Sequence, residues 1–344
     1  MKKFFGFLII LTLSGFFLWQ GIYSPKNTSL EKEVIFNIEK GEGSRDIALN
    51  LEKEGLIRWG PVLRVYVLIK GVPGKLQAGS YLLSPSMNIS EIVEKFVKGE
   101  AIKEKIIIIE GWNLRDIGFY LENKGMFQAE ELWEIAGFPA TDYSKVKDLP
   151  TPKDFSSEYD FLEEKPKNIG LEGYLFPDTY ETNKMVDIEE IVRKMLNNFD
   201  KKLTSELKEE INKQGKTIFE IITIASLIEK EVKTKEDKEL VSGVLWKRLK
   251  NGIPLQIDST ISYITGKQTT KISREETKID SPYNTYKYRG LPLGPISNPG
   301  LESILTAVYP ESSNYWYYLS TPEGETIFSK TLEEHNIAKN TYLK

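Results

Sequence analysis

Two glutamates at the end of an apolar stretch have the surroundings that proton-transfer chemistry needs. Residues 217–232 leave almost no polar arc, so a helix over them is predicted to be buried nearly all round. Glu231 follows Leu227 by four residues and therefore shares the apolar face of that helix. Burial and the negative end of the helix dipole both favour a protonated carboxyl group, which is the form that a general acid uses.

These glutamates also have a plainer interpretation. A surface carboxylate at a fraying helix end, beside Lys230 and Lys233, would give the same sequence. On these residues alone both interpretations of Glu231 remain open. Glu229 lies two positions away, about opposite on the helix, so the two side chains cannot face one cleft. We expect Glu229 to support the structure by bonding to loop backbone or to a lysine.

Composition excludes several other kinds of site. The 344 residues include no cysteine, which excludes disulfides, thiolate nucleophiles and cysteine metal sites. Any histidine-based mechanism must use the single histidine, His335, which we expect to be structural. There is no HExxH motif and no glycine-rich phosphate loop, so we expect no metal and no cofactor. With 46 basic and 50 acidic residues and no basic block, nucleic acid is excluded as a partner.

The N-terminus predicts a membrane anchor. Residues 4–23 carry no charge, and a bilayer-spanning helix needs about 20 apolar residues. Two lysines precede this run, which predicts a cytoplasmic N-terminus, and Trp19 and Tyr23 suit an outer aromatic belt. A cleaved signal peptide is the alternative, but the run exceeds a typical h-region and no A-x-A-like site follows. We expect residues 1–24 to be a cytoplasmic tip and single-pass anchor in the cell membrane, with the rest of the chain extracytoplasmic.

A small α+β module is predicted over residues 25–102. Its expected elements are a strand over 33–38, helices over 44–54 and 61–70, a strand over 77–83 and a helix over 88–99. The βααβ order resembles a LysM-like module, a small fold that grips glycans containing N-acetylglucosamine. A plain α+β spacer is the alternative, because the resemblance is topological and no diagnostic motif accompanies it.

The remaining chain is predicted to form a connecting region and a larger domain, both of mixed α+β class. In residues 103–170 we expect an apolar strand over 103–109, helices over 113–124 and 128–136, and an irregular loop over 138–170. In residues 171–344 we expect helices over 187–214, 217–232, 234–251 and 301–309, a hairpin over 315–328 and a last helix. Prolines stiffen the apolar loop 283–300, and an ordered loop of that length is usually functional.

Five motifs carry a family resemblance. They are Glu172–Tyr180 (EGYLFPDTY), Ala225–Glu231 (ASLIEKE), Leu255–Asp258 (LQID), Tyr283–Tyr286 (YNTY) and Gly290–Gly300 (GLPLGPISNPG). Together, and in this order, they resemble the YceG-like family of endolytic murein transglycosylases, over essentially the whole chain. The resemblance implies cleavage of the β-1,4 bond between N-acetylmuramic acid (MurNAc) and N-acetylglucosamine (GlcNAc) inside peptidoglycan strands, with 1,6-anhydro ends as the product.

The resemblance also assigns roles and partners. The second glutamate of the family's E-K-E is its essential acid, and this position is Glu231 here. The family suggests work beside peptidoglycan synthases, with the cut helping to set the length of nascent glycan strands. Two departures stand out, because the family often has Thr at Val232 and Pro or Ala at Ser259. We expect neither to touch a group that takes part in the chemistry.

Transglycosylation needs one carboxyl group that acts first as acid and then as base. A lysozyme-like hydrolase of the same bond is a second hypothesis, and it would need a water-positioning carboxylate such as Glu172 or Asp258. A non-catalytic glycan-binding scaffold for cell-wall synthesis is a third. Under the first hypothesis Glu172 is a second polar group of the cleft, or else a cap of its own turn.

Five further residues are predicted to contact the substrate. Gln256 and Asp258 either hold sugar hydroxyls or orient the acid, with plain turn structure as the alternative. Tyr283, Asn284 and Tyr286 offer a stacking face, an amide and hydroxyls, which suit sugar rings and N-acetyl groups. A packed loop core is the alternative for these three, most of all for Tyr286.

Overall fold

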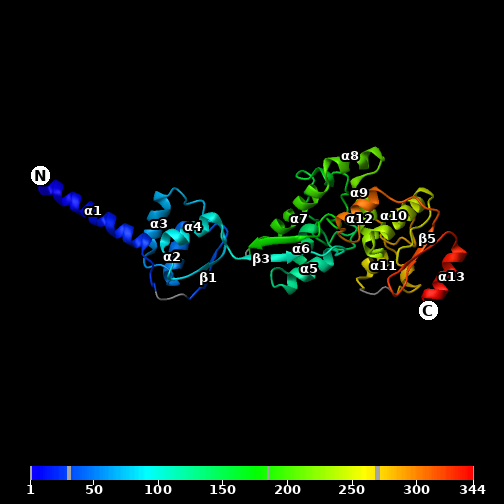
Figure 1. The fold of residues 1–344 in the computed structure, drawn as a ribbon, viewed down its shortest axis with the longest axis horizontal. Coiled ribbons are helices and arrows are strands. Elements are labelled where there is room, and N and C mark those ends of the chain that lie inside the picture. The colour runs from blue at the N-terminus through cyan, green and yellow to red at the C-terminus, as the bar shows by residue number, and fades with distance from the viewer. Residues whose placement is uncertain (1, 29–31, 184–185, 268–271, 344) are drawn as a thin grey trace. The chain divides into compact units, whose positions relative to one another are not determined.

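The computed structural model describes residues 2–28, 32–183, 186–267 and 272–343. The chain is of mixed α+β class, as predicted, and divides into two compact units (Figure 1). The first unit comprises Met1–Ile106 and Glu181–Asp187, and the second comprises Ile107–Tyr180 and Ile188–Lys344. The chain therefore leaves the first unit, returns to it briefly, and leaves it again.

The first unit begins with helix α1 (Lys2–Tyr23). Its segment Phe4–Tyr23 is long and apolar enough to cross a membrane, which agrees with the predicted anchor in length and composition. Most of its described side chains are exposed, but the last turns differ. Ile22 is buried and Leu18 packs against the core of the module that follows, so the end of α1 is part of that module's fold.

The module follows the predicted order of elements. These are β1 (Val34–Ile38), α2 (Ser44–Lys53), α3 (Gly60–Ile69), β2 (Gly79–Leu83) and α4 (Ile89–Lys98). The two strands pair antiparallel, with Phe36 opposite Tyr81. Because side chains alternate along a strand, these aromatics point into the core, where Phe96 of α4 lies 4.7 Å from the Tyr81 ring, centroid to centroid. Ile35 points to the opposite face and is exposed.

A second two-stranded sheet joins segments that are distant in sequence. β3 (Lys103–Ile107) pairs with β4 (Thr179–Asn183), a strand that the sequence did not predict. β3 is shorter than the strand expected over 103–109, and its isoleucines are not all buried. Ile106 and Ile108 are buried while Ile107 is exposed, as expected for a sheet covered on one face only.

The second unit is mostly helical. Its helices and strands are α5 (Leu114–Asn123), α6 (Ala129–Ala136), η1 (Asp160–Leu162), α7 (Ile188–Lys202), α8 (Ser205–Lys213), α9 (Ile218–Glu231), α10 (Lys235–Lys250), α11 (Asp258–Thr265), η2 (Glu276–Lys278), α12 (Leu301–Val308), β5 (Tyr317–Ser320), β6 (Thr326–Ser329) and α13 (Leu332–Tyr342). The strands β5 and β6 form the predicted hairpin, with Tyr318 opposite Phe328.

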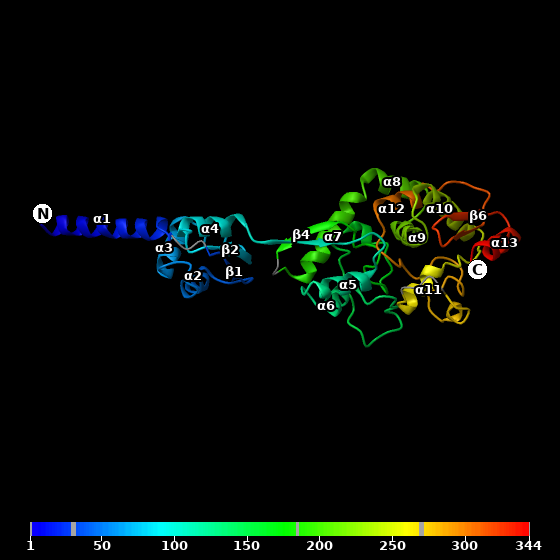
Figure 2. The ribbon, with the colours of Figure 1, turned by 60° about the horizontal axis from the view of Figure 1, so that its bottom comes forward.

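Helix α9 lies in the core of this unit, beside α10 and α12 (Figures 1 and 2). A capping box between Thr217 and Glu220 starts the helix. Every residue from Ile221 to Ile228 is buried, as the apolar pattern predicts. The helix ends at Glu231, because Val232 is in an extended conformation. The unit is therefore built around a helix whose last residue carries a carboxyl group.

Truncating Phe96 tests whether the two units are separate cores. Phe96 is fully buried in the first unit, so Phe96→Ala is expected to cost about 3–5 kcal/mol of that unit's free energy of unfolding. Hydrogen exchange of the full chain in detergent should then show lost protection in the first unit only. Leu82→Ala, at an exposed position of the same module, serves as the control. Equal loss of protection in both units would contradict the division.

Candidate active site

The Glu231 carboxyl group is held by two hydroxyls from distant parts of the chain. Ser259 Oγ donates a hydrogen bond to Oε1 at 2.8 Å, and the Tyr318 hydroxyl donates to Oε2 at 3.2 Å. Ser320 Oγ donates to the backbone carbonyl of Glu231 at 3.2 Å. Both carboxyl oxygens are therefore held by protein hydroxyls, in a residue that is partly exposed as a whole.

This environment sets the protonation state of Glu231. Desolvation is the largest effect and raises the pKa of Glu231 to about 7. The hydrogen bond from Ser259 lowers it, the negative charge of Asp258 raises it, and the hydrogen bond from Tyr318 lowers it. The carboxyl group is therefore divided between its acid and base forms near neutral pH, which suits a group that must give and take a proton.

The turn at Gln256 and the start of α11 at Asp258 are bonded to the segment around Tyr286. The Gln256 N–H donates to the Thr285 carbonyl at 3.1 Å, and the Ile257 N–H donates to Thr285 Oγ1 at 2.9 Å. The Tyr286 hydroxyl donates to Asp258 Oδ1. Two motifs separated in sequence thus meet at Thr285, and they present exposed or partly exposed side chains beside Glu231.

Gln256 also has an unusual backbone. Its φ of 54° lies in the left-handed region, which is uncommon for a residue other than glycine. Arg248 holds this turn through two hydrogen bonds. One guanidinium nitrogen donates to the Leu255 carbonyl at 2.8 Å, and another donates to Gln256 Oε1 at 3.4 Å. Arg248 is buried, and its guanidinium lies 5.1 Å from the centre of the Tyr317 ring.

Glu229 lies against loop backbone and a lysine. Its Oε2 accepts a hydrogen bond from the Gly300 N–H at 3.0 Å, at the N-terminus of α12, where a negative charge is favourable. Its Oε1 lies 3.6 Å from Nζ of the buried Lys238, which also pairs with Glu302 at 3.1 Å. These are the kinds of partner expected for a supporting carboxylate.

Glu172 is enclosed in a buried polar network. Its oxygens accept hydrogen bonds from the Leu114 N–H at 3.1 Å, from the Tyr263 hydroxyl at 3.0 Å and from Asn298 Nδ2 at 3.2 Å. Burial raises the pKa of Glu172 to about 8, and the bonds from Leu114 and Tyr263 lower it. Only 4% of the residue is exposed, so this carboxyl group joins three parts of the unit and is closed to solvent.

Tyr283 and Asn284 are buried as well. The Asn284 side chain donates to the carbonyls of Thr277 and Ile279 and accepts from the N–H groups of Tyr286 and Lys287, so every part of the amide folds its own loop. The Tyr283 ring packs against Tyr263, with centroids 5.2 Å apart. Of the predicted site residues, Asp258 and Tyr286 lie close enough to Glu231 for their charges and dipoles to act on one another, and the exposed Gln256 bonds to Arg248. The following three lie in the interior: Glu172, Tyr283 and Asn284.

Sequence reasoning missed residues that touch the acid. Tyr318 and Ser320 lie on β5, and nothing in that strand's sequence distinguishes them from the other tyrosines and serines of the hairpin. Ser259 was expected to touch no group that takes part in the chemistry, and this expectation is wrong, because its hydroxyl bonds directly to Glu231. Ser259 could have been singled out from the sequence, because it follows Asp258 directly and stands where the family often has Pro or Ala.

The single histidine supports the strand that carries Tyr318. The His335 ring stacks on Tyr317 at 5.2 Å, and burial lowers the pKa of His335 to about 4. It is therefore neutral near pH 7 and acts as a packing group. Within the described residues, no cluster of three or more His, Asp or Glu side chains is placed to hold a metal ion.

Removing the Asn298 side chain tests the buried network. Its Oδ1 accepts from the N–H groups of Gly173 at 3.0 Å and Leu175 at 2.9 Å, and its Nδ2 donates to the Trp112 carbonyl at 3.0 Å as well as to Glu172. Asn298→Ala leaves the buried N–H groups of Gly173 and Leu175 without this acceptor and is expected to cost about 3–5 kcal/mol of stability. Chemical denaturation measures the loss.

The matched control is Asn251→Ala, which removes one exposed hydrogen bond at the end of α10. It should change stability by about 0.5 kcal/mol or less. If both variants unfolded at the same denaturant concentration, Asn298 would not be the structural centre that its contacts indicate.

Comparisons with known proteins agree with this architecture. The YceG-like family profile matches residues 36–341. An endolytic murein transglycosylase of Bacillus subtilis is 33% identical over 336 residues, covering 97% of this chain and 91% of that protein. One from Streptococcus pneumoniae is 33% identical over 367 residues, covering 99% of this chain and 65% of that longer protein.

A solved structure is similar throughout. The crystal structure of a yceG-like protein from Listeria monocytogenes matches with a TM-score of 0.59 and 33% identity, covering 90% of this chain and 99% of that one. The relatives' names describe lytic transglycosylases, so the predicted enzyme class is confirmed. By profile, sequence and structure, the chain belongs to the YceG-like family.

Proposed function

We propose that this enzyme cleaves the β-1,4 bond between MurNAc and GlcNAc within peptidoglycan strands and leaves 1,6-anhydroMurNAc ends. The observation that carries the proposal is the Glu231 carboxyl group, which has a pKa of about 7 and lies at the family's E-K-E position. The names of the relatives, endolytic murein transglycosylases, supply the substrate and the reaction type.

One carboxyl group is sufficient for both steps. In the first step protonated Glu231 gives its proton to the glycosidic oxygen, and the bond between that oxygen and C1 of MurNAc breaks. In the second step the carboxylate takes the proton of the C6 hydroxyl of the same MurNAc while O6 bonds to C1. Glu231 is thereby protonated again, and no water is consumed.

The hydroxyls around Glu231 suit this alternation. A serine or tyrosine hydroxyl donates a hydrogen bond to a carboxylate and accepts one from a carboxylic acid. Ser259 and Tyr318 can therefore stay bonded to Glu231 in both of its states after a simple rotation of their O–H bonds. An ammonium partner would hold the group ionised and would weaken it as an acid.

Roles for the other predicted residues follow from their placement. We assign substrate contacts to Gln256, Asp258 and Tyr286, whose side chains are exposed or partly exposed, and of which Asp258 and Tyr286 bond to each other near Glu231. We assign support to Glu229, Glu172, Tyr283 and Asn284, whose polar atoms bond to protein or are buried. Arg248 positions the Gln256 turn from below.

The remaining parts are assigned on the same basis. We propose that residues 1–24 anchor the enzyme in the cell membrane with the N-terminus in the cytoplasm. The module of residues 25–102 then acts as a LysM-like glycan-binding part, and residues 171–344 form the catalytic domain together with most of the region 103–170, which packs into the same compact unit from Ile107 onward. An anchored enzyme that cuts within strands helps to terminate nascent glycans made by nearby peptidoglycan synthases.

Muropeptide analysis of Glu231→Gln tests the reaction. The variant cannot donate a proton, so anhydro products are expected to fall by about 10²–10⁴-fold. Mass spectrometry of digested glycan counts anhydro and reducing ends. Glu236→Gln, at an exposed position nearby, is the control and should cut like the parent. A folded Glu231→Gln enzyme with parental activity would exclude Glu231 as the acid, and a parent protein that produced neither kind of new end would favour the non-catalytic scaffold.

The same digest addresses the hydrolase. Asp258 is the remaining carboxylate close enough to Glu231 to influence its charge, so a hydrolytic mechanism would depend on Asp258 to position water. Reducing ends that disappear in Asp258→Asn would establish hydrolysis. Anhydro ends that persist at lower yield in this variant would support the transglycosylase with Asp258 as a substrate contact.

Ser259→Ala tests how the acid is tuned. The Ser259 hydrogen bond lowers the pKa of Glu231, so its removal raises that pKa. Since activity falls as Glu231 loses its proton, the alkaline limb of the pH–rate profile should move to higher pH, by about one unit if the bond is worth about 1.5 kcal/mol. Ser320→Ala removes a bond to backbone only and should leave the limb in place. A limb that moved to lower pH would refute the role of Ser259.

A further inference from the structure

One face of α3 is apolar and exposed although the module's core does not need it. The exposed residues form what we call the α3 stripe: Trp59, Val65, Leu68 and Ile69, which are 52%, 37%, 61% and 71% exposed. Positions 65, 68 and 69 are three and four residues apart and therefore lie on one side of the helix. The other side, with Leu63 and Val67, is fully buried. The stripe is thus a second apolar surface on a helix that is already packed.

The charges that α3 and its flanking residues carry have one sign, and two acidic groups of other elements lie near them: Glu52, which accepts from the Gly60 N–H at 2.8 Å, and Glu94, near Lys70. Residues 57–75 contain four cations and no Asp or Glu, in a chain whose net charge is −4. The cations are Arg58, Arg64, Lys70 and Lys75. Tryptophan and aliphatic side chains bordered by Arg and Lys are the composition of a helix that lies in a membrane interface. Anionic phospholipids attract such a surface, and a neutral apolar partner would gain nothing from the cations.

The position of α3 along the chain's apolar span supports the same partner. A Cβ on Gly21 of α1 would lie 3.2 Å from Val62 and 3.8 Å from Trp59, so α3 lies directly against the last turns of α1. Gly21 is two residues from the end of the segment Phe4–Tyr23, a rise of about 3 Å. If α1 spans the bilayer, its contact with α3 is at the level of the outer headgroups.

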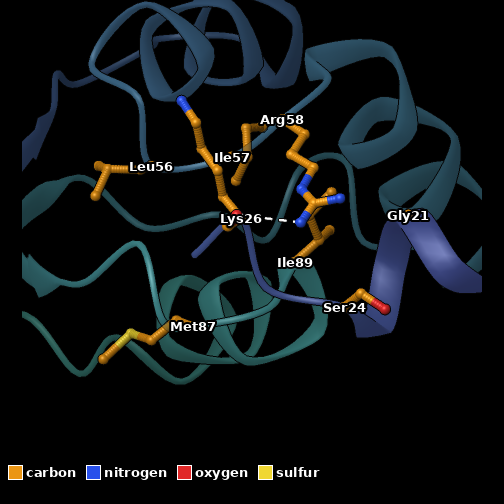
Figure 3. A pocket seen from close by; sticks show the side chains of 8 residues that line it. All are labelled: Gly21, Ser24, Lys26, Leu56, Ile57, Arg58, Met87 and Ile89. Carbon is orange, nitrogen blue, oxygen red and sulfur yellow. Dashed lines mark hydrogen bonds between the residues drawn. The ribbon is translucent and has the colours of Figure 1, made fainter. Parts of the chain in front are cut away.

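The chain leaving α1 is also fixed to the start of α3. Figure 3 shows Lys26 and Arg58 beside Ser24 and Gly21, at the end of α1. Arg58 donates to the carbonyls of Pro25 at 3.3 Å and Lys26 at 3.1 Å. The hollow between them is only about 10 Å³, so it holds no ligand. These two hydrogen bonds join the segment that follows α1 to the residue that precedes α3, and so keep the start of α3 beside the end of α1.

We propose that the α3 stripe and its cations lie in the outer interface of an anionic phospholipid bilayer. Leu68, Ile69 and Trp59 enter the headgroup region, and the cations meet lipid phosphates. The inference rests on the proposed membrane anchoring by α1 and adds a second membrane contact to it. The module is then held against the bilayer surface by two elements and cannot swing freely on α1.

A single-cysteine label tests the inference, since the natural chain has no cysteine. The full-length variants Leu68→Cys and Ile35→Cys carry an environment-sensitive nitrobenzoxadiazole label in vesicles of phosphatidylglycerol and phosphatidylethanolamine. Ile35 is a matched control, because it is 56% exposed on the opposite face of the module's sheet. At position 68 we expect blue-shifted emission, severalfold stronger quenching by doxyl lipids than at position 35, and protection from aqueous iodide.

Charge and anchoring are tested in the same vesicles. The combined variant Arg64→Glu, Lys70→Glu and Lys75→Glu leaves the bonds from Arg58 to Pro25 and Lys26 in place and should lose most of the lipid quenching at position 68, as should vesicles of phosphatidylcholine alone. Carbonate extraction reports on α1 separately: release of the parent protein would refute the proposed anchor itself. A retained protein whose label at position 68 is quenched by iodide and not by lipid would refute the α3 contact alone. A label shielded from both quenchers would also overturn it, and would indicate a protein partner or a second copy.

Discussion

The structure depends on the pair of hydroxyl hydrogen bonds that hold the Glu231 carboxyl group. They come from α11 and β5, and the acid itself ends α9, so three elements must meet within hydrogen-bonding distance. Neither partner carries a charge. Desolvation and the negative charge of Asp258 raise the pKa of Glu231, the two neutral donors lower it, and the result is about 7.

Other contacts in the second unit fix the position of α9, and with it the position of Glu231. Burial of α9 fixes where the acid can lie, and the loop 283–300 is bonded to the same helix, because Ser226 Oγ accepts from the Ile296 N–H at 3.1 Å and the Ser226 carbonyl accepts from Ser297 Oγ at 3.0 Å. Glu229 then ties α9 to the start of α12. The proline-rich loop is therefore attached to the helix that ends in Glu231 at three points of its length.

The sequence predicted what local patterns determine. Apolar periodicity predicted α9 and its last residue, and turn residues predicted the hairpin β5–β6. The sequence could not predict the hydrogen bond from Tyr318 to Glu231, because these residues are 87 positions apart and their contact depends on how the hairpin packs. A polar side chain in a motif also looks the same whether it faces a ligand or backbone, which is why Asn284 and Glu172 were expected in the cleft. β4 was missed because TYETN, its sequence, has no apolar alternation.

The pairing of β3 with β4 has a practical consequence for anyone dividing this protein. A recombinant fragment that begins at residue 108 keeps β4 but discards the strand that satisfies its N–H and C=O groups. β4 then has an unpaired edge, to which β4 of another copy of the fragment can pair, so we expect the fragment to associate. A fragment that begins within α1 should keep the last turns of that helix, because Leu18 and Ile22 pack into the core of the first unit.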